Sequence, residues 1–335
     1  MTGDSLDPED WDSFRATAHD MLEAALDKMQ SATEGRVWTP LPDGIKQSLT
    51  SDLPREGIGI ERTQQAVQAL MPYGVGNTHP RFFGWVHGAG SPNGLVADIA
   101  AAAMNANLGG RDHGAIYVER QVVQWVRSLF EFPDTASGLV VSGTSMATVV
   151  ALKVARDVKL AFANQRVGSS GVELVGYTSV QTHNCVARAF DLLGLGTDAL
   201  RLIAVDENFE MDVAALKSAI AADKVAGKVP FCIVGTAGSV NVGAIDDLDA
   251  IADIAAAEDI WFHVDGAFGA SCMLSEELRP RLIGITRADS LAFDFHKWWH
   301  VNYAVGFVLI RHDADHLRSF TMQAEYLAGQ KRGLA

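Results

Sequence analysis

Two segments of the chain place polar side chains between a predicted strand and a predicted helix. The first is 142–145 (SGTS), where the N–H groups of a helix N-terminus and the hydroxyls of Thr144 and Ser145 suit a phosphate. Ser145 alone is equally well explained as an ordinary N-cap. The second is 181–184 (QTHN), whose His183 could cap the helix, stack on a planar ring or transfer a proton.

Two later segments carry a carboxylate and a lysine. Asp265 ends the mostly apolar run 260–265, and the small residues Gly266 and Ala267 leave room for a flat molecule. A buried carboxylate needs a partner, although a strand-end Asp also commonly caps a turn. Lys297 lies in FDFHKWW (293–299), where loss of water contact would favour Schiff-base chemistry. The ordinary alternative is a lysine with its head in solvent.

Together the four segments supply the groups that pyridoxal phosphate requires. They are a phosphate cup, a ring-stacking side chain, an acid for the pyridinium nitrogen and a lysine, in that order along the chain. The phosphate cup has no GxGxxG and no Walker lysine, which argues against a dinucleotide or a nucleoside triphosphate. The pairs His296/His300 and His312/His316 lack an HExxH glutamate or a cysteine pair, so no metal site is expected.

The elements around these residues alternate between short β-branched runs and helical patterns. Strands are predicted at 139–141, 173–177, 201–205, 231–235, 261–264, 290–293 and 305–310. Helices are predicted at 145–164, 184–193, 213–222 and 248–258, and the alanines 100–103 predict a further, close-packed helix. This alternation is typical of an α/β fold with a mainly parallel seven-stranded sheet and helices on both faces. Ligands of such sheets bind at the carboxyl ends of the strands.

The first eighty residues have a different pattern. Apolar residues at helical spacing over 14–29 predict a helix, a Pro/Gly-rich stretch follows at 39–59, and a second helix is predicted at 61–70. We expect a helical and extended dimerisation arm over 1–78 and a large cofactor-binding domain over 79–335.

Composition excludes several classes of protein. The chain has 335 residues and a formal net charge of −14, which argues against nucleic-acid or anionic-membrane partners. Its start does not resemble a secretory signal, and no apolar run reaches the ~18–20 residues of a membrane span. The three cysteines, Cys185, Cys232 and Cys272, show no CxxC spacing and are expected to be free thiols. A cytoplasmic protein is expected.

The motifs resemble those of the group II pyridoxal-phosphate-dependent amino-acid decarboxylases, which include aromatic-L-amino-acid, histidine and glutamate decarboxylases. The resemblance is carried, in order, by HPRFFGW (79–85), SGTSMAT (142–148), THNCVARAF (182–190), GTAGSVNVGAID (235–246), DIWFHVDGAFGA (259–270) and ADSLAFDFHKWWHVN (288–302). The most specific signal is the HVD and HKW pair, whose Asp265 and Lys297 are 32 residues apart.

The resemblance implies a type I, aspartate-aminotransferase-like fold and three catalytic residues. Lys297 would form the internal aldimine, Asp265 would pair with the pyridine nitrogen and His183 would stack on the ring. Ala267 would pack on the other ring face, Thr144, Ser145 and His296 would hold the phosphate, and Thr236 would lie close by. The implied cofactor-binding residues are therefore Thr144, Ser145, His183, Thr236, Asp265, Ala267, His296 and Lys297.

The resemblance also implies a reaction and an assembly. The expected reaction is decarboxylation of an aromatic or otherwise bulky L-amino acid to the amine and CO₂, through an aldimine on Lys297 and a quinonoid. The alternatives are an aldehyde-forming decarboxylase, another carbon–carbon lyase or an aminotransferase, and a non-catalytic or split-enzyme subunit. A homodimer is expected. The family places a further small domain of ~100 residues after the lysine strand, so we expect that domain to be absent or supplied by a separate chain.

One departure from the family pattern concerns Asp294, where many members have Asn. An acid beside a phosphate is repulsive unless it turns away or accepts from a donor, so Asp294 is left out of the predicted site. His87, Arg111 and His113 could contact a substrate carboxylate or form only loop hydrogen bonds.

Overall fold

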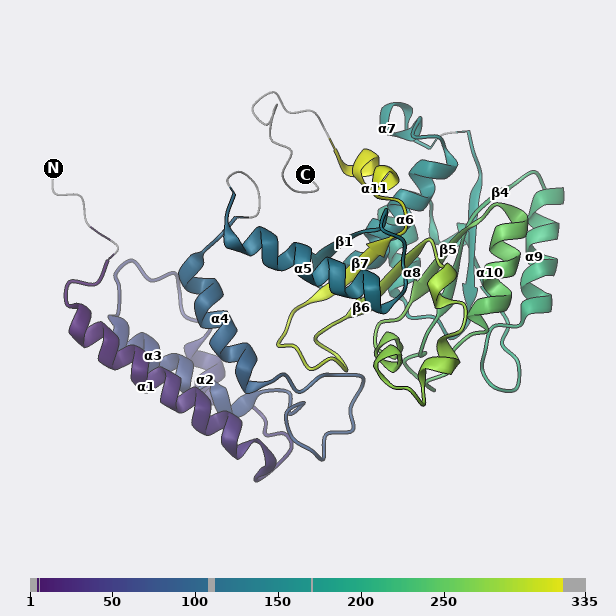
Figure 1. Cartoon of the computed structure of the whole chain (residues 1–335). Coiled ribbons are helices and arrows are strands. Elements are labelled where there is room, and N and C mark those ends of the chain that lie inside the picture. Colours follow the sequence, from purple (N-terminus) through teal and green to yellow (C-terminus); the bar gives the residue numbers. More distant parts are fainter. Residues whose placement is uncertain (1–4, 6, 108–111, 170, 322–335) are drawn as a thin grey trace.

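A seven-stranded sheet with the order β1-β7-β6-β5-β4-β2-β3 forms the centre of the protein (Figure 1). The structure is a computed structural model that describes residues 5, 7–107, 112–169 and 171–321. The strands are β1 (Ser137–Val141), β2 (Leu174–Ser179), β3 (Leu200–Ile203), β4 (Val229–Thr236), β5 (Trp261–Asp265), β6 (Ser290–Asp294) and β7 (Gly306–Ile310).

The sheet is mainly parallel, as the sequence predicts. Strands β3, β2, β4, β5 and β6 pair in parallel, whereas β7 runs antiparallel to both β6 and β1. Each predicted strand overlaps an observed one. The carboxyl ends of β1, β2, β4, β5 and β6 therefore lie along one edge of the sheet, and β7 begins there.

Helices cover both faces of the sheet. One face packs against α5 (Gly114–Leu129), α9 (Val213–Val225) and α10 (Leu248–Glu258). The other packs against α6 (Thr144–Lys159) and α8 (Cys185–Leu192). The type I fold expected from the sequence has this three-layer arrangement.

The buried strands supply side chains to both faces in alternation. In β4, Ile233 belongs to the core under α9 and α10, while its neighbours Cys232 and Val234 belong to the core under α6 and α8. All three side chains are fully buried. Successive side chains of a strand point to opposite faces, so a strand covered on both sides is apolar throughout.

The predicted helix 145–164 is two helices. Helix α6 ends at Lys159, and the short α7 (Asn164–Val167) follows. Between them, Ala161 and Phe162 have φ values of 48° and 64°. This left-handed backbone stops the helix, and the residue types at these two positions give no warning of it.

Helix α11 (Asp313–Phe320) packs against α6. The 3-10 helices are Ser31–Thr33, Met71–Tyr73, Thr197–Ala199, Gly269–Leu274, Arg279–Leu282 and Ile285–Arg287. Within the described ranges, no helix has the length and apolar character needed to cross a membrane.

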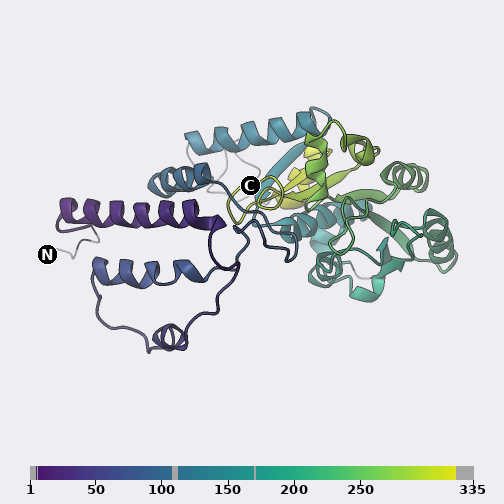
Figure 2. The ribbon, with the colours of Figure 1, turned by 90° about the horizontal axis from the view of Figure 1, so that it is seen from below.

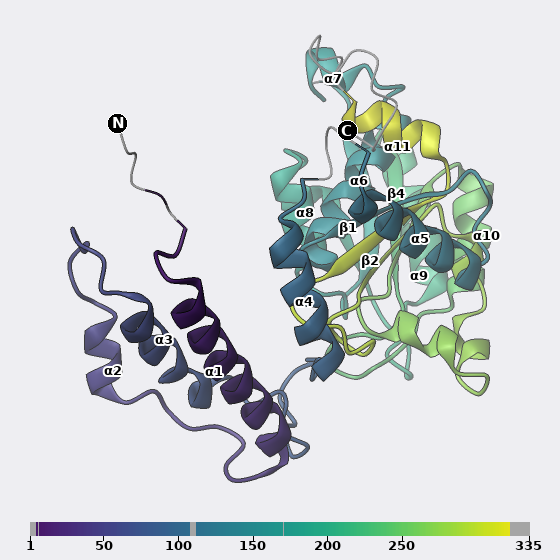
Figure 3. The same cartoon turned by 60° about the vertical axis from the view of Figure 1, so that its left-hand side comes forward.

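The amino-terminal part forms four helices with open apolar faces. They are α1 (Trp11–Gln30), α2 (Asp43–Ser48), α3 (Ile60–Gln68) and α4 (Pro92–Met104). Helices α1 and α3 lie side by side and stand away from the sheet (Figures 2 and 3). No residue of these four helices is buried. The prediction of a close-packed helix at 100–103 is thus correct for the helix and wrong for the packing, because these alanines are exposed.

Candidate functional site

The N-terminus of α6 lies at the edge where the strands end. Its N-cap is Gly143, which has no side chain to accept from the first N–H groups of the helix. Asp294, at the end of β6, takes this role: its Oδ1 accepts from the Thr144 N–H at 2.6 Å. Ser145 is exposed, while the Thr144 hydroxyl is buried and has no hydrogen-bond partner among the described residues.

Gly306, the first residue of β7, lets this turn approach the sheet closely. A Cβ atom at Gly306 would lie 2.4 Å from the Gly143 Cα atom and 2.9 Å from Asp294 Oδ1. Asp294, Gly306 and Val141 also lie opposite one another in the strand register. The glycine therefore brings the start of α6 and the end of β6 into contact.

Asp265 ends β5 in a buried environment. Its side chain has 3% of its surface exposed, and Oδ1 accepts from the Ala267 N–H at 3.0 Å. The Cys185 thiol donates to Oδ2 at 3.8 Å. Burial raises the pKa of the Asp265 carboxyl, while the Ala267 N–H and the charge of Lys297 act in the opposite direction. A cationic group placed beside Asp265 would therefore be strongly favoured.

Lys297 lies just beyond β6, three residues after Asp294. Its Nζ is 2.9 Å from Asp294 Oδ2, and its side chain keeps 24% of its surface exposed. His296 is buried, and its Nδ1 lies 2.9 Å from the Val305 carbonyl oxygen and 3.0 Å from the Val305 N atom. The Nε2 atom of His296 is 3.9 Å from Asp294 Oδ2. One carboxylate thus faces the lysine, the histidine and the N-terminus of α6.

Thr236 ends β4 next to Asp265 in the strand register. Asp246 holds this strand end, because its Oδ2 accepts from the Thr236 N–H at 2.7 Å and its Oδ1 accepts from the Met211 N–H at 2.7 Å. Burial raises the pKa of Asp246 to about 6. The Thr236 hydroxyl is buried, and no described residue forms a hydrogen bond with it.

A cavity of about 280 Å³ opens at this edge of the sheet. Six of the predicted site residues line it: His183, Thr236, Asp265, Ala267, His296 and Lys297. His183 is exposed and comes from the loop between β2 and α8, where its Nδ1 accepts from the Cys185 N–H at 3.3 Å. Thr144 and Ser145 do not line the cavity. Asp294 contacts both the Thr144 N–H and Lys297 Nζ, so Thr144 lies one side chain away from the cavity lining.

Asp294 is the main correction to the predicted site. The sequence prediction excluded it because its charge would repel a phosphate, but it is 3% exposed and bonded to two donors. An acid three residues before a lysine was a signal that the two could pair. Tyr303 and Phe268 also line the cavity and were missed, because aromatic residues in loops carry no distinctive pattern.

The three open candidates for substrate contact have different outcomes. His87 lines the cavity, and its ring packs against Phe82 and Trp85, with centroids 5.7 Å from each. His113 does not line it, and its Nε2 is 2.8 Å from the Asn107 carbonyl oxygen. Arg111 lies outside the described residues.

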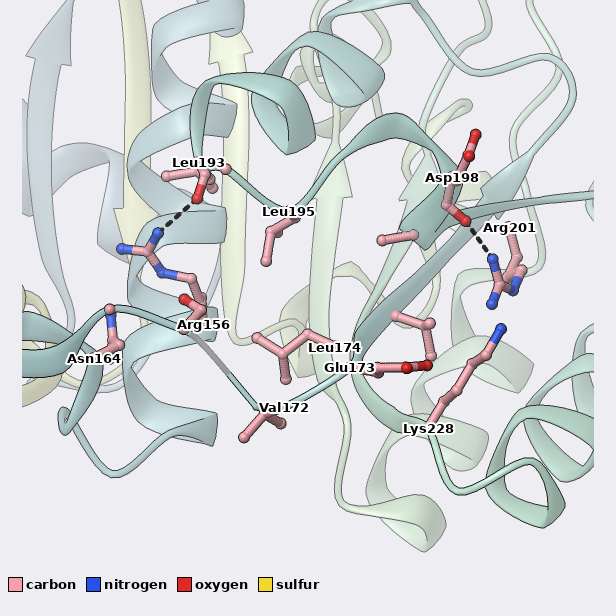
Figure 4. A pocket seen from close by; sticks show the side chains of 15 residues that line it. Arg156, Asn164, Val172, Glu173, Leu174, Leu193, Leu195, Asp198, Arg201 and Lys228 are labelled. Carbon is pink, nitrogen blue, oxygen red and sulfur yellow. Dashed lines mark hydrogen bonds between the residues drawn. The ribbon is translucent and has the colours of Figure 1, made fainter.

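A larger cavity, of about 650 Å³, lies at the opposite edge of the sheet (Figure 4). It is lined by residues at the starts of β2, β3 and β4. Its arginines already have partners: Arg156 donates to the Leu193 carbonyl at 2.9 Å, and Arg201 donates to the Asp198 carbonyl. None of the predicted site residues lines this cavity.

The cavity at the carboxyl edge fits pyridoxal phosphate. Two buried hydroxyls, those of Thr144 and Thr236, have no partner in the part of the chain that the structure describes. A buried carboxylate, Asp265, is available for a ring nitrogen, and a part-exposed lysine faces the same cavity. Buried polar groups are normally satisfied, so these hydroxyls are suited to a bound polar ligand.

Comparisons with known proteins agree with this geometry. Residues 42–335 match the pyridoxal-dependent decarboxylase conserved domain. The chain is 42% identical over 290 residues to the aromatic-L-amino-acid decarboxylase of Bacillus atrophaeus, covering 85% of this chain and 58% of that protein. It is 31% identical to the cysteine sulfinic acid decarboxylase of Rattus norvegicus, covering 93% of this chain and 64% of that protein.

Solved structures are also similar to this chain. The crystal structure of mouse CSAD has a TM-score of 0.88 and 29% identity, covering 97% of this chain and 69% of that one. The crystal structure of Oryza sativa TDC with PLP and tryptamine has a TM-score of 0.87 and 26% identity. The match covers 97% of this chain and 69% of that one. The chain spans about three fifths of the length of the first curated relatives that it matches. By sequence, fold and site geometry, this chain belongs to the pyridoxal-phosphate-dependent decarboxylase family.

Proposed function

We propose that the protein decarboxylates an L-amino acid with an aromatic or bulky uncharged side chain, releasing the amine and CO₂. The observation that carries the proposal is the meeting of Lys297, Asp265 and His183 at one cavity with two unsatisfied buried hydroxyls nearby. The similarity to decarboxylases over most of the chain supports it.

The chain's own residues have distinct roles in this proposal. When bound, pyridoxal phosphate supplies an electron-accepting ring that stabilises the charge left as CO₂ departs. Lys297 provides the amine that anchors the cofactor. Asp265 holds a proton on the ring nitrogen, because its buried carboxylate needs a cationic partner. Ala267, on the loop after β5, lines the cavity beside Asp265 and leaves room for a flat ring.

The phosphate group would lie at the start of α6. The Ser145 N–H and the hydroxyls of Thr144 and Ser145 are available to it, and the helix N-terminus favours its negative charge. The backbone of Val305 contacts Nδ1 of His296, so Nε2 is the ring nitrogen that would face the phosphate. Thr236 contributes a third hydroxyl from the end of β4.

His183 is the residue placed to stack on the ring and to carry a proton at Cα of the substrate. It lies on the exposed loop after β2, and its ring is held by the hydrogen bond to the Cys185 N–H. An imidazole has one nitrogen that can donate a proton and one that can accept it, so this side chain is suited to proton transfer.

The cavity lining supports an aromatic substrate over an acidic one. Trp85, Phe268 and Tyr303 line it together with two valines. Among the described lining residues, Lys297 carries the one ammonium, and no guanidinium is present to pair with a substrate sulfinate or carboxylate side chain. Aromatic rings prefer stacked or edge-on aromatic neighbours.

Product analysis on a panel of amino acids tests the proposal. The chain, loaded with pyridoxal phosphate, is incubated with L-tryptophan, L-phenylalanine, L-cysteine sulfinate and L-2,4-diaminobutyrate, and amine and CO₂ are quantified. We expect equal amounts of both from the aromatic substrates, none with Lys297→Ala, and unchanged amounts with the control Lys217→Ala, whose lysine is exposed on α9. An aldehyde with ammonia, a keto acid, or turnover of the sulfinate alone would contradict the proposal.

We also propose that the protein is a homodimer joined through the arm 1–78, with 79–335 as the cofactor-binding domain. Support comes from the open apolar faces of α1 and α3, where large side chains such as Trp11 and Val67 are about half exposed. Surfaces of this kind mark interaction sites. The three cysteines are unpaired, which supports a reducing, cytoplasmic location.

A further inference from the structure

Asp294 has contacts that the proposed reaction does not use. It ends β6, is 3% exposed, and both of its carboxylate oxygens are engaged. Oδ1 accepts from the Thr144 N–H at 2.6 Å, and Oδ2 lies 2.9 Å from Lys297 Nζ. The carboxylate therefore connects the lysine to the first N–H of α6.

The N-terminus of α6 needs a hydrogen-bond acceptor from outside the helix. A helix needs acceptors for its first N–H groups, and an N-cap Ser, Thr, Asp or Asn usually provides one. Helices α9 and α10 have such caps, Asp212 and Asp247, which accept from their own first turns. The N-cap of α6 is Gly143, so the acceptor has to come from another element.

The packing around Asp294 keeps its carboxylate in one place. Gly306 and Gly143 lie so close to Oδ1 that a Cβ atom at either position would be 2.9 Å or 3.6 Å from it. Asp294 N also donates to the Ala267 carbonyl oxygen at 3.0 Å, which ties the residue to the loop after Asp265. A carboxylate fixed in this way can orient both groups that it contacts.

We propose that Asp294 is a positioning residue, whose single carboxylate serves as the remote N-cap of α6 and as the counter-ion that holds the Lys297 ammonium at the cofactor site. This inference rests on the proposed function only in assigning Lys297 to the cofactor. The contacts themselves concern the chain before any cofactor binds. Asp294 thereby fixes the position of the Lys297 amine relative to the turn that would bind the phosphate.

Two variants separate the two roles. Asp294→Asn keeps an oxygen for the Thr144 N–H and removes the charge, whereas Asp294→Ala removes both. The matched control is Asp289→Asn, at the other end of β6, where Asp289 Oδ2 accepts from the Phe262 N–H at 2.8 Å. All chains are studied at full length without cofactor. The results therefore do not depend on whether a variant binds the cofactor or forms the amine.

The first readout is the reactivity of Lys297. Trace acetic anhydride is applied across a pH series, and acetylation of Lys297 is measured by mass spectrometry relative to the exposed Lys217. The contact with Asp294 Oδ2 holds the Lys297 amine in place, so its loss leaves this part-exposed side chain free to reach the reagent. We expect faster acetylation of Lys297 in both Asp294 variants and none of this increase in Asp289→Asn. An unchanged rate, or an equal increase in the control, would overturn the counter-ion role.

The second readout is hydrogen exchange at the start of α6, measured on peptides that include Thr144. The proposal expects protection of its N–H to be kept in Asp294→Asn and lost in Asp294→Ala. Equal protection in both variants would overturn the capping role. If either variant fails to fold, a crystal structure of the unsubstituted chain without cofactor decides: the paired lysine and the bonded Thr144 N–H support the proposal, and a lysine turned away from Asp294 refutes it.

Discussion

Asp265 illustrates how burial turns an ordinary side chain into one suited to catalysis. In water its carboxylate would be fully solvated, but at the end of β5 one backbone N–H and one thiol are its only hydrogen-bond donors among the residues that the structure describes. Burial accordingly raises its pKa, and a nearby positive charge becomes the main means of keeping it ionised. In the proposed function, the cationic ring nitrogen of the cofactor supplies that charge.

Replacing Asp265 by Asn keeps the shape and the hydrogen bond from the Ala267 N–H but removes the charge. We expect amine formation to fall by about 100-fold or more, because a neutral amide cannot hold the ring nitrogen in its cationic form. The measurement is kcat with saturating cofactor. Asp289→Asn, a half-buried substitution away from the cavity, should keep wild-type activity, and wild-type kcat in Asp265→Asn would refute the assigned role.

At the scale of elements, the site depends on how closely α6 approaches β6 and β7. Gly306 allows the contact, and Gly143 starts the helix without a side chain of its own. These two glycines are spaced far apart in the sequence, and only the pairing of β1 with β7 brings them together. The geometry is therefore a property of the sheet and not of either segment.

Gly306→Ala tests this contact. The added Cβ would be 2.4 Å from the Gly143 Cα atom, so the start of α6 must shift. Overpacking of this kind costs about 1–3 kcal/mol, and we expect pyridoxal phosphate affinity to fall by about tenfold. Fluorescence titration measures the affinity. Gly114→Ala, where a Cβ meets no atom within 4 Å, is the matched control and should bind as the wild type does; equal affinities in all three chains would show that the contact is unimportant.

Helix α11 gives a prediction about pH. His316 is 2% exposed, its Nδ1 is 2.8 Å from Ser137 Oγ, and burial, together with the charge of Lys153, lowers its pKa to about 4. The unfolded histidine takes up a proton near 6.5. Between these values the unfolded state binds more protons, so stability falls as pH falls from about 6.5 to about 4.

We expect His316→Gln to lose less unfolding free energy than the wild type over this pH range, by about 2–3 kcal/mol. Urea unfolding at pH 7 and near pH 4.5 measures the difference. The raised pKa of Asp246 acts in the opposite direction, but its contribution is the same in both chains and cancels. An identical pH dependence in the two chains would contradict the assignment to His316.

The sequence predicts the strands well because they are buried on both faces and therefore consist of short apolar runs. It places Lys297, Asp265 and His183 at one edge because parallel strands share that edge. It misses α5, whose apolar residues face the sheet on one side only, and the end of α6 at the left-handed Ala161. It excludes Asp294 because the donors that satisfy this carboxylate come from α6 and from Lys297, and their convergence is visible only in three dimensions.

At the scale of the whole molecule, the arm is the least self-sufficient part. Helices α1, α2 and α3 bury no residue, and a groove between α1 and α3 is lined by Phe14, Met21, Ile60 and Val67. An apolar groove of this kind is unfavourable in water. A second chain that covers it would supply the missing burial.

Light scattering after size exclusion tests the proposed dimer. We expect twice the chain mass of 35.9 kDa for the wild type. Val67→Asp, which places a charge in the groove, should shift the mass toward the monomer, whereas Glu23→Asp on the outside of α1 should not. Deletion of residues 1–70 should give aggregated or unstable protein. An active, well-behaved monomer after that deletion would refute the dimerisation role of the arm.

The identity of the lysine that holds the cofactor is the central point of the proposed function. The chain is incubated with pyridoxal phosphate and reduced with borohydride, which makes the link between cofactor and lysine nitrogen permanent, and its peptides are mapped by mass spectrometry. We predict one pyridoxyl modification, on Lys297, which disappears in Lys297→Ala and persists in Lys217→Ala. A modification on another lysine, or no modification in the wild-type chain, would contradict the proposed function.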